Sequence, residues 1–283
     1  MITGSTQLVF ILGHPVEHSL SPVFQNEAIR KKELPWVYVP LEVEPVHLPN
    51  VIEMIRSENV RGANVTVPMK TMILRHLDRV DLSAQRLNSV NTIYKRKGRL
   101  HGTSTDGEGF LLSLGSWRKS LRGSQGMIVG AGGAARAVGN ALASSGIKSL
   151  MIANWDAKEA EGLQAAVRQG FRKLQTGILS LEEGAKIVPE CDWVIQATSL
   201  GLKKGDPSPI SLKKARPRTW VLDLIYHRET EFLRQAGNQK LLSKNGLGML
   251  LYQGALSFEL WTGKRAPLFD MKRALLQTLA QVS

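Results

Sequence analysis

The sequence predicts an α/β protein of two domains, for three reasons. The chain has 283 residues, more than a single hydrophobic core usually accommodates. Apolar, strand-like segments alternate with helix-like segments along most of its length. A glycine-rich turn between an apolar strand and a helix of small residues opens a second unit near residue 126. Such alternation implies mostly parallel sheets with helices on both faces.

The first unit is expected to begin with a strand and to alternate from there. Its predicted strands cover residues 7–12, 37–43, a segment ending near Thr66, 90–95 and 100–102. Its predicted helices cover residues 21–32, 45–57, 68–76, a stretch starting near Leu82, and 106–119. Asp81 is the expected cap of the helix at Leu82.

The second unit is expected to start with a strand, a turn and a helix. Its predicted strands cover residues 126–129, 149–153, 192–197 and 219–224, and a small-residue helix covers 133–145. The last segment, residues 246–281, is typical of two helices broken near 263–267.

Composition argues against a disulfide-linked or metal-binding protein. Hydrophobic residues make up 43% of the chain and charged residues 22%, as in ordinary globular proteins. Cys191 is the only cysteine, so no disulfide or thiolate metal site can form within one chain. The six histidines are scattered along the chain. We therefore predict no metal site, and we expect Cys191 to be a small buried residue.

The net charge of +13 raises the question of a nucleic-acid partner. The basic clusters are dispersed along the chain and are not interleaved with aromatic residues. Solvated surface is therefore the favoured interpretation, and nucleic-acid binding is a distant alternative. A milder functional interpretation is that the positive field attracts small anions.

No targeting or membrane segment is predicted. The first residues carry no positive charge before their apolar part and lack a clear cleavage site. The longest apolar tract, residues 246–261, is interrupted by Gln253 and Glu259, and it is too short to span a bilayer. The cytoplasm is the expected compartment.

The turn at residues 130–135, with the sequence GAGGAA, has the context of a dinucleotide-binding fingerprint. An apolar strand precedes it, a helix follows it, and a second strand comes about 20 residues later. Glycines permit the tight turn and close approach of the backbone to a pyrophosphate, and the helix start supplies free N–H groups. This turn predicts a Rossmann-type dinucleotide-binding domain.

The end of the second strand leaves the choice of dinucleotide open. An acidic residue there favours NAD, whereas an arginine favours the extra phosphate of NADP. The chain has Asn154, Trp155 and Asp156, with Lys158 close by. Asp156 is alternatively a helix cap, and Trp155 either lies against the adenine or shields the sheet edge.

The run from Gly62 to Lys70 predicts a binding edge. It starts as a buried strand, and Asn64, Thr66 and Lys70 fall at or near the carboxyl end, where ligands bind in open α/β sheets. Asp106 follows another strand; alone it is equally well a helix cap. Beside Lys70, its carboxylate would hold the ammonium in place, and the lysine could donate a proton to an oxygen as a hydride arrives on the adjoining carbon.

Several motifs together give a specific resemblance. They are GHPVEHSLSP at residues 13–22, RGANVTVPMK at 61–70, NSVNT at 88–92, STDGEG at 104–109, GAGGAA at 130–135, ATSLGL at 197–202 and NGLGMLLYQGALSFELW at 245–261. In this order they resemble the shikimate dehydrogenase family over nearly the whole chain. The resemblance implies NADPH-dependent, reversible reduction of 3-dehydroshikimate to shikimate, in chorismate and aromatic amino-acid biosynthesis.

The resemblance also implies roles for individual residues. Lys70 would be the catalytic acid/base and Asp106 its partner and a substrate ligand. The further implied substrate-binding residues are Ser19, Ser21, Thr66, Asn91, Tyr226 and Gln253. The implied cofactor-binding residues are Gly130, Ala131, Gly132, Gly133, Ala134, Asn154, Trp155, Asp156, Lys158, Leu224 and Gly246.

Each of these residue types also has a simpler interpretation. Ser19 and Ser21 could cap the helix that follows, Tyr226 could be a packing aromatic, and Gln253 could be an exposed helical residue. For Gln253, the apolar neighbours favour a buried partner.

The chain departs from the family pattern at several positions. Ser104 stands where the family usually has asparagine, and His14 where it usually has asparagine or aspartate. At the adenosine end, Trp155 and Asp156 replace an arginine and a threonine of the NADP-type members. NADP(H) is the expected cofactor, and NAD(H) is the alternative.

The predicted organisation follows from these assignments. Residues 1–106 with 244–283 would form the substrate-binding domain, and residues 107–243 the dinucleotide-binding domain, with the active site in a cleft between them. The nearest alternative function is an NAD-dependent quinate/shikimate dehydrogenase of the same family. A monomer and a homodimer are both compatible with the sequence.

Overall fold

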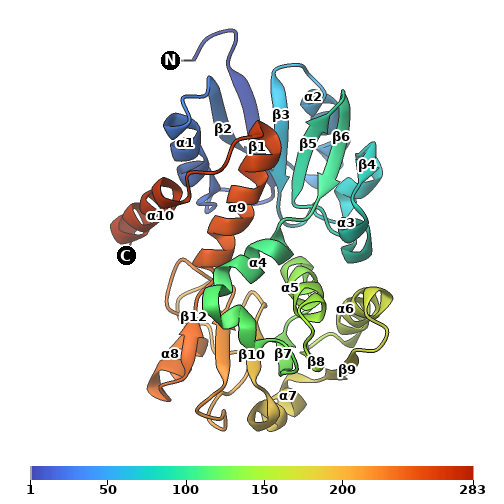
Figure 1. Cartoon of the computed structure of the whole chain (residues 1–283), viewed down its shortest axis with the longest axis vertical. Helices are drawn as coiled ribbons and strands as arrows, with labels where there is room; N and C mark the ends of the chain where they lie inside the picture. The colour runs from blue at the N-terminus through green and yellow to red at the C-terminus, as the bar shows by residue number, and fades with distance from the viewer. Residues whose placement is uncertain (1, 283) are drawn as a thin grey trace. The chain divides into compact units, whose positions relative to one another are not determined.

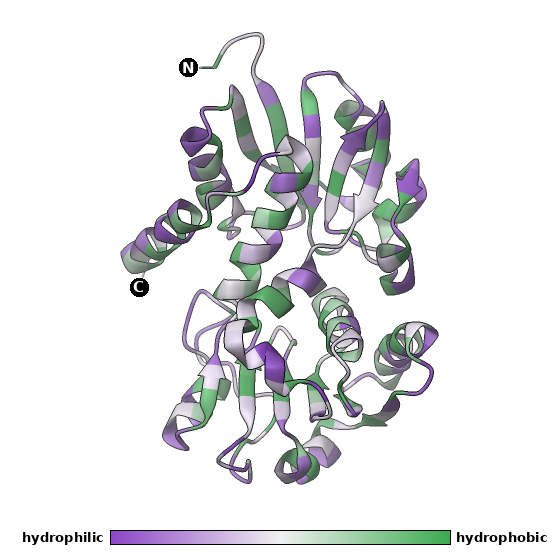
Figure 2. Cartoon of the chain, in the orientation of Figure 1, coloured by the Kyte–Doolittle hydropathy of each residue, from purple (hydrophilic) through white to green (hydrophobic). Residues whose placement is uncertain are grey.

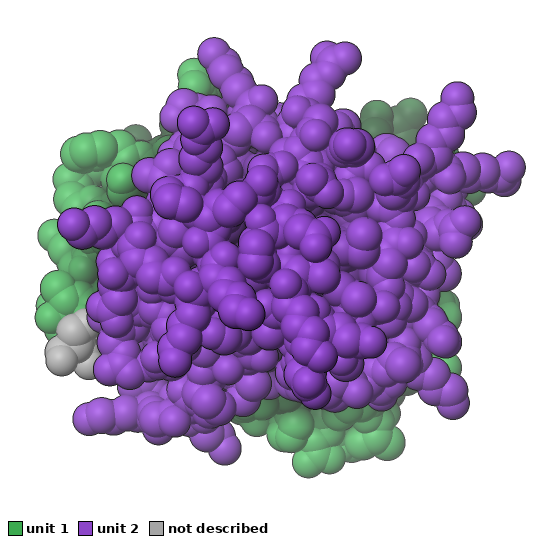
Figure 3. All heavy atoms as spheres, turned by 90° about the horizontal axis from the view of Figure 1, so that it is seen from below, with its two compact units in different colours: residues 1–109, 250–283 green, residues 110–249 purple. Residues whose placement is uncertain are grey.

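The structure is a computed structural model that describes residues 2–282. It divides into two compact units, which Figure 3 colours separately. Residues 1–109 and 250–283 belong to unit 1, and residues 110–249 belong to unit 2. The predicted cleft between domains stays a prediction.

Unit 1 contains a six-stranded sheet in the order β2-β1-β3-β5-β6-β4 (Figure 1). Its strands are β1 (Gln7–Gly13), β2 (Trp36–Glu42), β3 (Val60–Val65), β4 (Arg79–Val80), β5 (Thr92–Arg96) and β6 (Arg99–Thr103). Strands β2, β1 and β3 are parallel, whereas β5 is antiparallel to both β3 and β6. The predicted helix-covered parallel arrangement is therefore correct for one half of this sheet only.

The helices of unit 1 come from both ends of the chain. They are α1 (Ser21–Lys31), α2 (Leu48–Ile55), α3 (Leu82–Leu87) and α10 (Leu268–Val282), together with the start of α4 (Asp106–Leu114) and most of α9 (Leu247–Thr262). In Figure 2, hydrophilic and hydrophobic residues alternate along α10. Its buried residues include Met271 and Leu275, as expected of a helix with one apolar face.

Unit 2 contains a six-stranded, fully parallel sheet in the order β12-β11-β10-β7-β8-β9. Its strands are β7 (Gln125–Val129), β8 (Ser149–Ala153), β9 (Gln175–Leu179), β10 (Trp193–Gln196), β11 (Trp220–Asp223) and β12 (Leu242–Lys244). Counted from β7, this is the doubly wound order 3-2-1-4-5-6, with its switch point between β7 and β10. The predicted Rossmann-type domain is confirmed.

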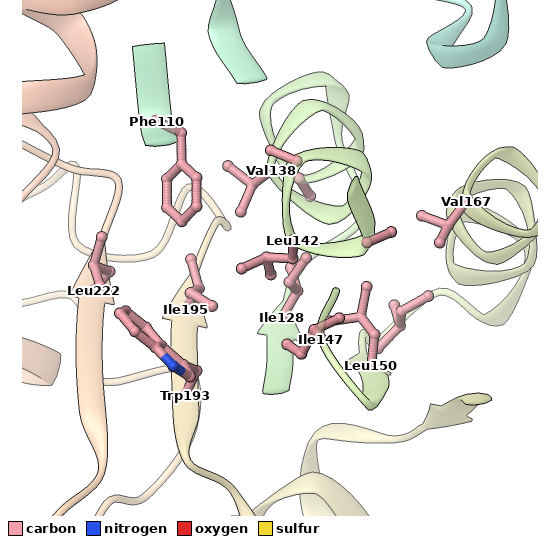
Figure 4. Close-up of a cluster of buried hydrophobic side chains, with 14 of the residues drawn as sticks. Phe110, Ile128, Val138, Leu142, Ile147, Leu150, Val167, Trp193, Ile195 and Leu222 are labelled. Atoms are coloured by element: carbon pink, nitrogen blue, oxygen red, sulfur yellow. The ribbon is translucent and has the colours of Figure 1, made fainter. Parts of the chain in front are cut away.

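Four helices, α5 (Gly133–Ser144), α6 (Ala157–Gly170), α7 (Leu181–Ile187) and α8 (Glu231–Asn238), accompany this sheet. Figure 4 shows side chains of its core, where Ile128 of β7 and Ile195 of β10 lie near Leu142 of α5. All three are completely buried. This packing holds α5 against β7 and β10, and the glycine-rich turn joins β7 to α5.

Several predicted elements need correction. The helix expected at residues 68–76 is a short 3-10 turn, Met72–His76. The helix expected at residues 106–119 ends as α-helix at Leu114, because Gly115 has a φ of +59° and a 3-10 turn follows. Asp81 does precede α3, but its side chain accepts no capping hydrogen bond from the described residues.

Within residues 2–282, no helix has the length and apolar character needed to cross a bilayer. Within the same residues, no group of three histidine, cysteine or acidic side chains is arranged to hold a metal ion.

Candidate active site

Lys70 and Asp106 form a close ion pair in unit 1. Lys70 lies in the turn after β3, and Asp106 is the first residue of α4. The Lys70 Nζ lies 2.6 Å from Asp106 Oδ2, and the two side chains are only 16% and 7% exposed. The sequence hypothesis that this carboxylate holds this ammonium is consistent with the geometry, and the low exposure shields the pair from water.

Asn91 binds the other oxygen of the same carboxylate. Its Nδ2 donates to Asp106 Oδ1 at 2.7 Å, and its Oδ1 accepts from the Thr105 backbone N–H at 2.9 Å. Asp106 is therefore held from two sides, by Lys70 and by Asn91. This fixes the plane of the carboxylate as well as its position.

Gln253 joins this group from α9. Its Oε1 accepts from Asn91 Nδ2 at 3.3 Å, and its Nε2 donates to the Leu250 carbonyl at 2.9 Å. Gly109 of α4 makes the approach of α9 possible, because a Cβ at that position would lie 2.6 Å from the Gln253 backbone nitrogen. The preference for a buried Gln253 with a partner agrees with the structure.

A buried polar network lies behind Asn91, and we call it the Asn64–Thr92–Ser257 network after its three members. Asn64 Nδ2 donates to Ser257 Oγ at 3.0 Å, and the Ser257 and Thr92 hydroxyls are 2.8 Å apart. Sequence reasoning did not single out Thr92 or Ser257. The available signal was Ser257 itself, a hydroxyl one helical turn after Gln253 in an otherwise apolar helix.

The two serines predicted to bind the substrate lie at the start of α1. Ser19 Oγ accepts from the Ser21 backbone N–H at 3.2 Å, so a local capping role is present in part. Ser21 is buried and lies near the Tyr38 hydroxyl. Burial raises the pKa of Tyr38, so this phenol stays a neutral hydrogen-bonding group.

Thr66 directly follows β3 and is half-buried. Its backbone N–H donates to the Leu12 carbonyl at 2.8 Å, which ties the end of β3 to the end of β1. Among the described residues, no hydrogen bond joins the hydroxyls of Ser19 or Thr66 to Lys70. The structure thus joins Lys70, Asp106, Asn91 and Gln253 through successive hydrogen bonds.

Tyr226, the remaining predicted substrate ligand, belongs to unit 2. It follows β11, and its ring lies 5.8 Å from the His227 ring. In the same region, Gly246 comes so close to Leu224 that a Cβ on the glycine would lie 2.0 Å from the Leu224 carbonyl oxygen. The structure therefore brings together Leu224 and Gly246, two of the predicted cofactor positions.

The glycine-rich turn fits a dinucleotide pyrophosphate. Gly130 has a φ of +107°, and a Cβ there would lie 2.8 Å from the Ala197 backbone, so only glycine fits. Gly132 is the N-cap of α5 and brings no side chain to its first N–H groups, and a Cβ added to it would meet no neighbour. The start of α5 is therefore open to an anionic ligand. Ala131, Gly133 and Ala134 complete this turn.

The start of α6 is different, because Asp156 already caps it. The carboxylate Oδ1 accepts from the N–H groups of Lys158 and Glu159 at 2.8 and 3.3 Å. Asn154 donates to the Asp156 carbonyl at 2.9 Å, and Trp155 is 59% exposed. The helix-cap interpretation of Asp156 agrees with the structure, and the exposed Trp155 ring is free of a packing role in the core.

Comparison with known proteins identifies the family. The family model "Shikimate dehydrogenase substrate binding domain" matches residues 11–93, and "Shikimate / quinate 5-dehydrogenase" matches residues 115–223. "Shikimate 5'-dehydrogenase C-terminal domain" matches residues 246–276. A shikimate dehydrogenase (NADP(+)) from Desulforamulus reducens is 40% identical, over 99% of this chain and 98% of that protein. The chain belongs to the shikimate dehydrogenase family.

Solved structures of this family have the same fold. Shikimate 5-dehydrogenase from Thermus thermophilus, in complex with NADP(H) and shikimate, is 34% identical with a TM-score of 0.85, covering 96% of this chain and 99% of that one. The enzyme from Listeria monocytogenes, in complex with shikimate and NAD, is 34% identical with a TM-score of 0.89, covering 97% and 98%. The fold predicted from the family resemblance is confirmed.

Two departures from the family pattern have clear surroundings. His14 Nδ1 lies 3.0 Å from Glu42 Oε1 at the surface, where it links the end of β1 to the end of β2. Ser104 Oγ is buried and has no hydrogen-bond partner among the described residues. The Ser104 hydroxyl therefore makes no hydrogen bond to the described residues that would fix the segment leading into Asp106.

Proposed function

We propose that this protein is a shikimate dehydrogenase that reversibly reduces 3-dehydroshikimate to shikimate with NADPH. The observation that supports this best is the Lys70–Asp106 pair, at 2.6 Å and largely shielded from water. When bound, NADPH supplies the hydride that adds to the carbonyl carbon of the substrate. Lys70 gives its proton to the carbonyl oxygen, and the neutral amine then takes a proton from water. In the reverse direction Lys70 accepts the hydroxyl proton.

The remaining predicted ligands have the chemistry that a hydroxylated carboxylic acid requires. Ser19 and Ser21 would bind the substrate carboxylate through their hydroxyls. Thr66, Asn91, Gln253 and Tyr226 would bind the ring hydroxyls. Asp106 would accept a hydrogen bond from a substrate hydroxyl while it holds Lys70. In this proposal residues 1–106 with 244–283 form the substrate domain, and residues 107–243 form the cofactor domain of a cytoplasmic enzyme.

The cofactor would lie along the carboxyl edge of the unit 2 sheet. Its pyrophosphate would bind at the open start of α5, with Gly130, Ala131, Gly132, Gly133 and Ala134. Leu224 and Gly246 would adjoin the nicotinamide part. At the other end, Asn154, Trp155, Asp156 and Lys158 would surround the adenosine.

A second candidate, NAD-dependent oxidation of quinate or shikimate, is favoured by one observation. The start of α6, where a 2′-phosphate would find N–H groups, is already occupied by the Asp156 carboxylate. That negative charge repels a phosphate, and only Lys158 is nearby in sequence to offset it.

Steady-state kinetics with four combinations separates the two candidates: shikimate or quinate, each with NADP+ or NAD+. We expect the highest kcat/KM with shikimate and NADP+. If NADP+ gives no rate with shikimate while NAD+ supports quinate oxidation, the first proposal is wrong and the second is right. Absence of a rate in all four combinations would contradict both.

A further inference from the structure

The orientation of the Asn91 amide is determined by its neighbours. The Thr105 backbone N–H can only donate, so the atom that it contacts at 2.9 Å must be the carbonyl oxygen Oδ1. The amide nitrogen must then face Asp106 Oδ1, 2.7 Å away. If the amide turned over, two oxygens would face one another at the carboxylate. The correct amide orientation is thus a condition for the correct placement of Asp106.

Thr92 is the second neighbour that fixes the orientation of the Asn91 amide. Its hydroxyl donates to Asn91 Oδ1 at 2.9 Å, and its single proton is used in that bond. Thr92 is the first residue of β5 and is completely buried, so no water competes for its hydroxyl. It touches neither Lys70 nor Asp106 by a hydrogen bond and acts through Asn91.

Ser257 and Asn64 continue the same line of donors. Asn64 Nδ2 lies 3.0 Å from Ser257 Oγ, and Ser257 Oγ lies 2.8 Å from Thr92 Oγ1. Ser257 has a second acceptor in the Gln253 carbonyl, at 3.0 Å, and the contact with Thr92 is the shorter one. With its proton directed at Thr92, each group donates to the next toward the carboxylate, and aligned hydrogen bonds strengthen one another.

Tyr38 starts this line. Its hydroxyl donates to Asn64 Oδ1 at 2.8 Å, which leaves the Asn64 amide nitrogen for Ser257 and the Asn91 carbonyl. The residues Tyr38, Asn64, Asn91, Thr92 and Ser257 are all buried and come from three strands, a loop and α9. All five residues lie away from the protein surface, and the line of hydrogen bonds ends at Asp106.

We propose that Thr92 and Ser257 are positioning residues for the reaction. They hold the Asn91 amide in the orientation that presents Asp106 Oδ2 to Lys70. The expected loss of kcat rests on the proposed function. The expected placement of Asn91 and Asp106 does not, because it can be tested without substrate.

The test uses variants that remove one hydroxyl each: Thr92→Val, Ser257→Ala and the double variant. In Thr92→Val we expect kcat for shikimate oxidation to fall about tenfold, the equivalent of one hydrogen bond, with a smaller change in KM. Thr92→Ser, which keeps the hydroxyl, should restore most of kcat. Since the shorter route from Ser257 to Asn91 runs through Thr92, at 2.8 Å against 3.3 Å to the Thr105 hydroxyl, the double variant should lose little more than Thr92→Val alone.

Thr103→Val is the matched control. Thr103 is the residue of β6 paired with Thr92, it is also buried, and its hydroxyl has no hydrogen bond to the described residues. We expect its kcat to equal that of the parent. An equal loss of kcat in Thr103→Val and Thr92→Val, or additive losses in the double variant, would show that general loosening of the sheet is the cause and would overturn the proposal.

Crystal structures of the parent and Thr92→Val decide the geometric part independently of activity. We expect the Asn91 amide to have turned, or Asp106 to have left hydrogen-bond distance of Lys70, in the variant. Unchanged positions of all three side chains would overturn the positioning role. If the parent has no dehydrogenase activity, the proposed function fails, and these two structures still decide whether Thr92 positions Asp106.

Discussion

At the scale of the residue, the candidate site depends on satisfying several polar groups away from water. Lys70 and Asp106 neutralise each other, and Asn91 and Gln253 complete their hydrogen bonds. A buried polar group left without a partner costs about 1–3 kcal/mol, and more when it is charged. Substitutions in this group therefore act on both stability and activity, and the two effects must be measured separately.

Lys70→Met tests the proton donor. Methionine keeps much of the length of the side chain but removes the ammonium, so we expect kcat to fall by about 10²–10⁴-fold while KM for shikimate changes much less. Steady-state kinetics of the folded variant gives both values. Lys264→Met, at an exposed lysine of the same unit, is the control and should retain the parent rate. An unchanged kcat in Lys70→Met would remove Lys70 from the mechanism.

Asp223 is a buried carboxyl whose ionisation opposes folding. Burial raises its pKa to about 6, against the opposing hydrogen bonds from Thr230 and the Ile225 N–H. Since its folded-state pKa is above the ordinary value of 3.8, its contribution to stability is fully present below pH 3.8 and is lost as the pH rises through 6. The amount is roughly 3 kcal/mol.

Asp223→Asn should remove this pH dependence. We expect the free energy of unfolding of the parent to fall more between pH 5 and pH 7.5 than that of the variant. Urea unfolding at both pH values measures the difference. Parallel pH dependence in parent and variant would mean that Asp223 does not titrate as described. The test concerns a group at the carboxyl end of β11, which leads to Leu224 and Tyr226.

At the scale of the element, the turn between β7 and α5 depends on one backbone conformation. Gly130 needs its positive φ and has no space for a Cβ next to Ala197. This close approach places β7, β10 and α5 so that the first N–H groups of α5 stay open.

Gly130→Ala should therefore weaken cofactor binding more than it weakens the fold. We expect the KM or Kd for NADP+ to rise about tenfold or more, since the turn must shift away from the position in which it fits a pyrophosphate. Calorimetry with NADP+ and thermal unfolding measure the two effects. Gly237→Ala is the matched control, because that helical glycine has open space around its Cβ position and ordinary φ. Equal cofactor affinity in both variants would contradict the proposed role of the turn.

At the scale of the whole molecule, the net charge of +13 is dispersed over both units. The proposed substrate and cofactor are both anions. A positive protein attracts them over a distance that salt shortens, to about 10 Å at 0.1 M ionic strength.

We expect kcat/KM for shikimate and for NADP+ to fall about threefold or more between 0.02 and 0.5 M KCl, with kcat nearly constant. Such a pattern is typical of electrostatic attraction of the ligand rather than of a damaged site. Thermal unfolding in the same buffers controls for stability. Values of kcat/KM that do not depend on salt would assign the surplus charge to solubility alone.

The fold could be predicted from sequence because its signals are local. The glycine turn at Gly130 and the apolar strands beside it identify a parallel, doubly wound sheet, whose order was then confirmed. In unit 1, β5 and β6 form a hairpin in which β5 lies antiparallel to β3, so half of that sheet runs against the expected direction. The direction in which β5 pairs with β3 depends on contacts between segments that are distant in sequence, which a local pattern does not contain.

The site could be predicted where a reactive side chain has its own motif, as Lys70 and Asp106 have. Thr92 and Ser257 could not, because serine and threonine occur everywhere and their importance comes only from meeting each other across 165 residues of sequence. Asp156 illustrates the reverse case. Its two sequence interpretations differ in what the carboxylate contacts, and the structure shows it accepting from the Lys158 N–H.

The division of unit 1 between two distant segments has a consequence for protein synthesis. On the ribosome, residues 110–249 emerge as one continuous stretch and can fold as soon as they are free, whereas Asn64 and Asn91 must wait for α9. Until Gln253 and Ser257 arrive, the amides of the nascent site have only water as partners on that side. The half proposed to hold Lys70 and its partners is thus assembled last, after the half proposed to bind the cofactor is complete.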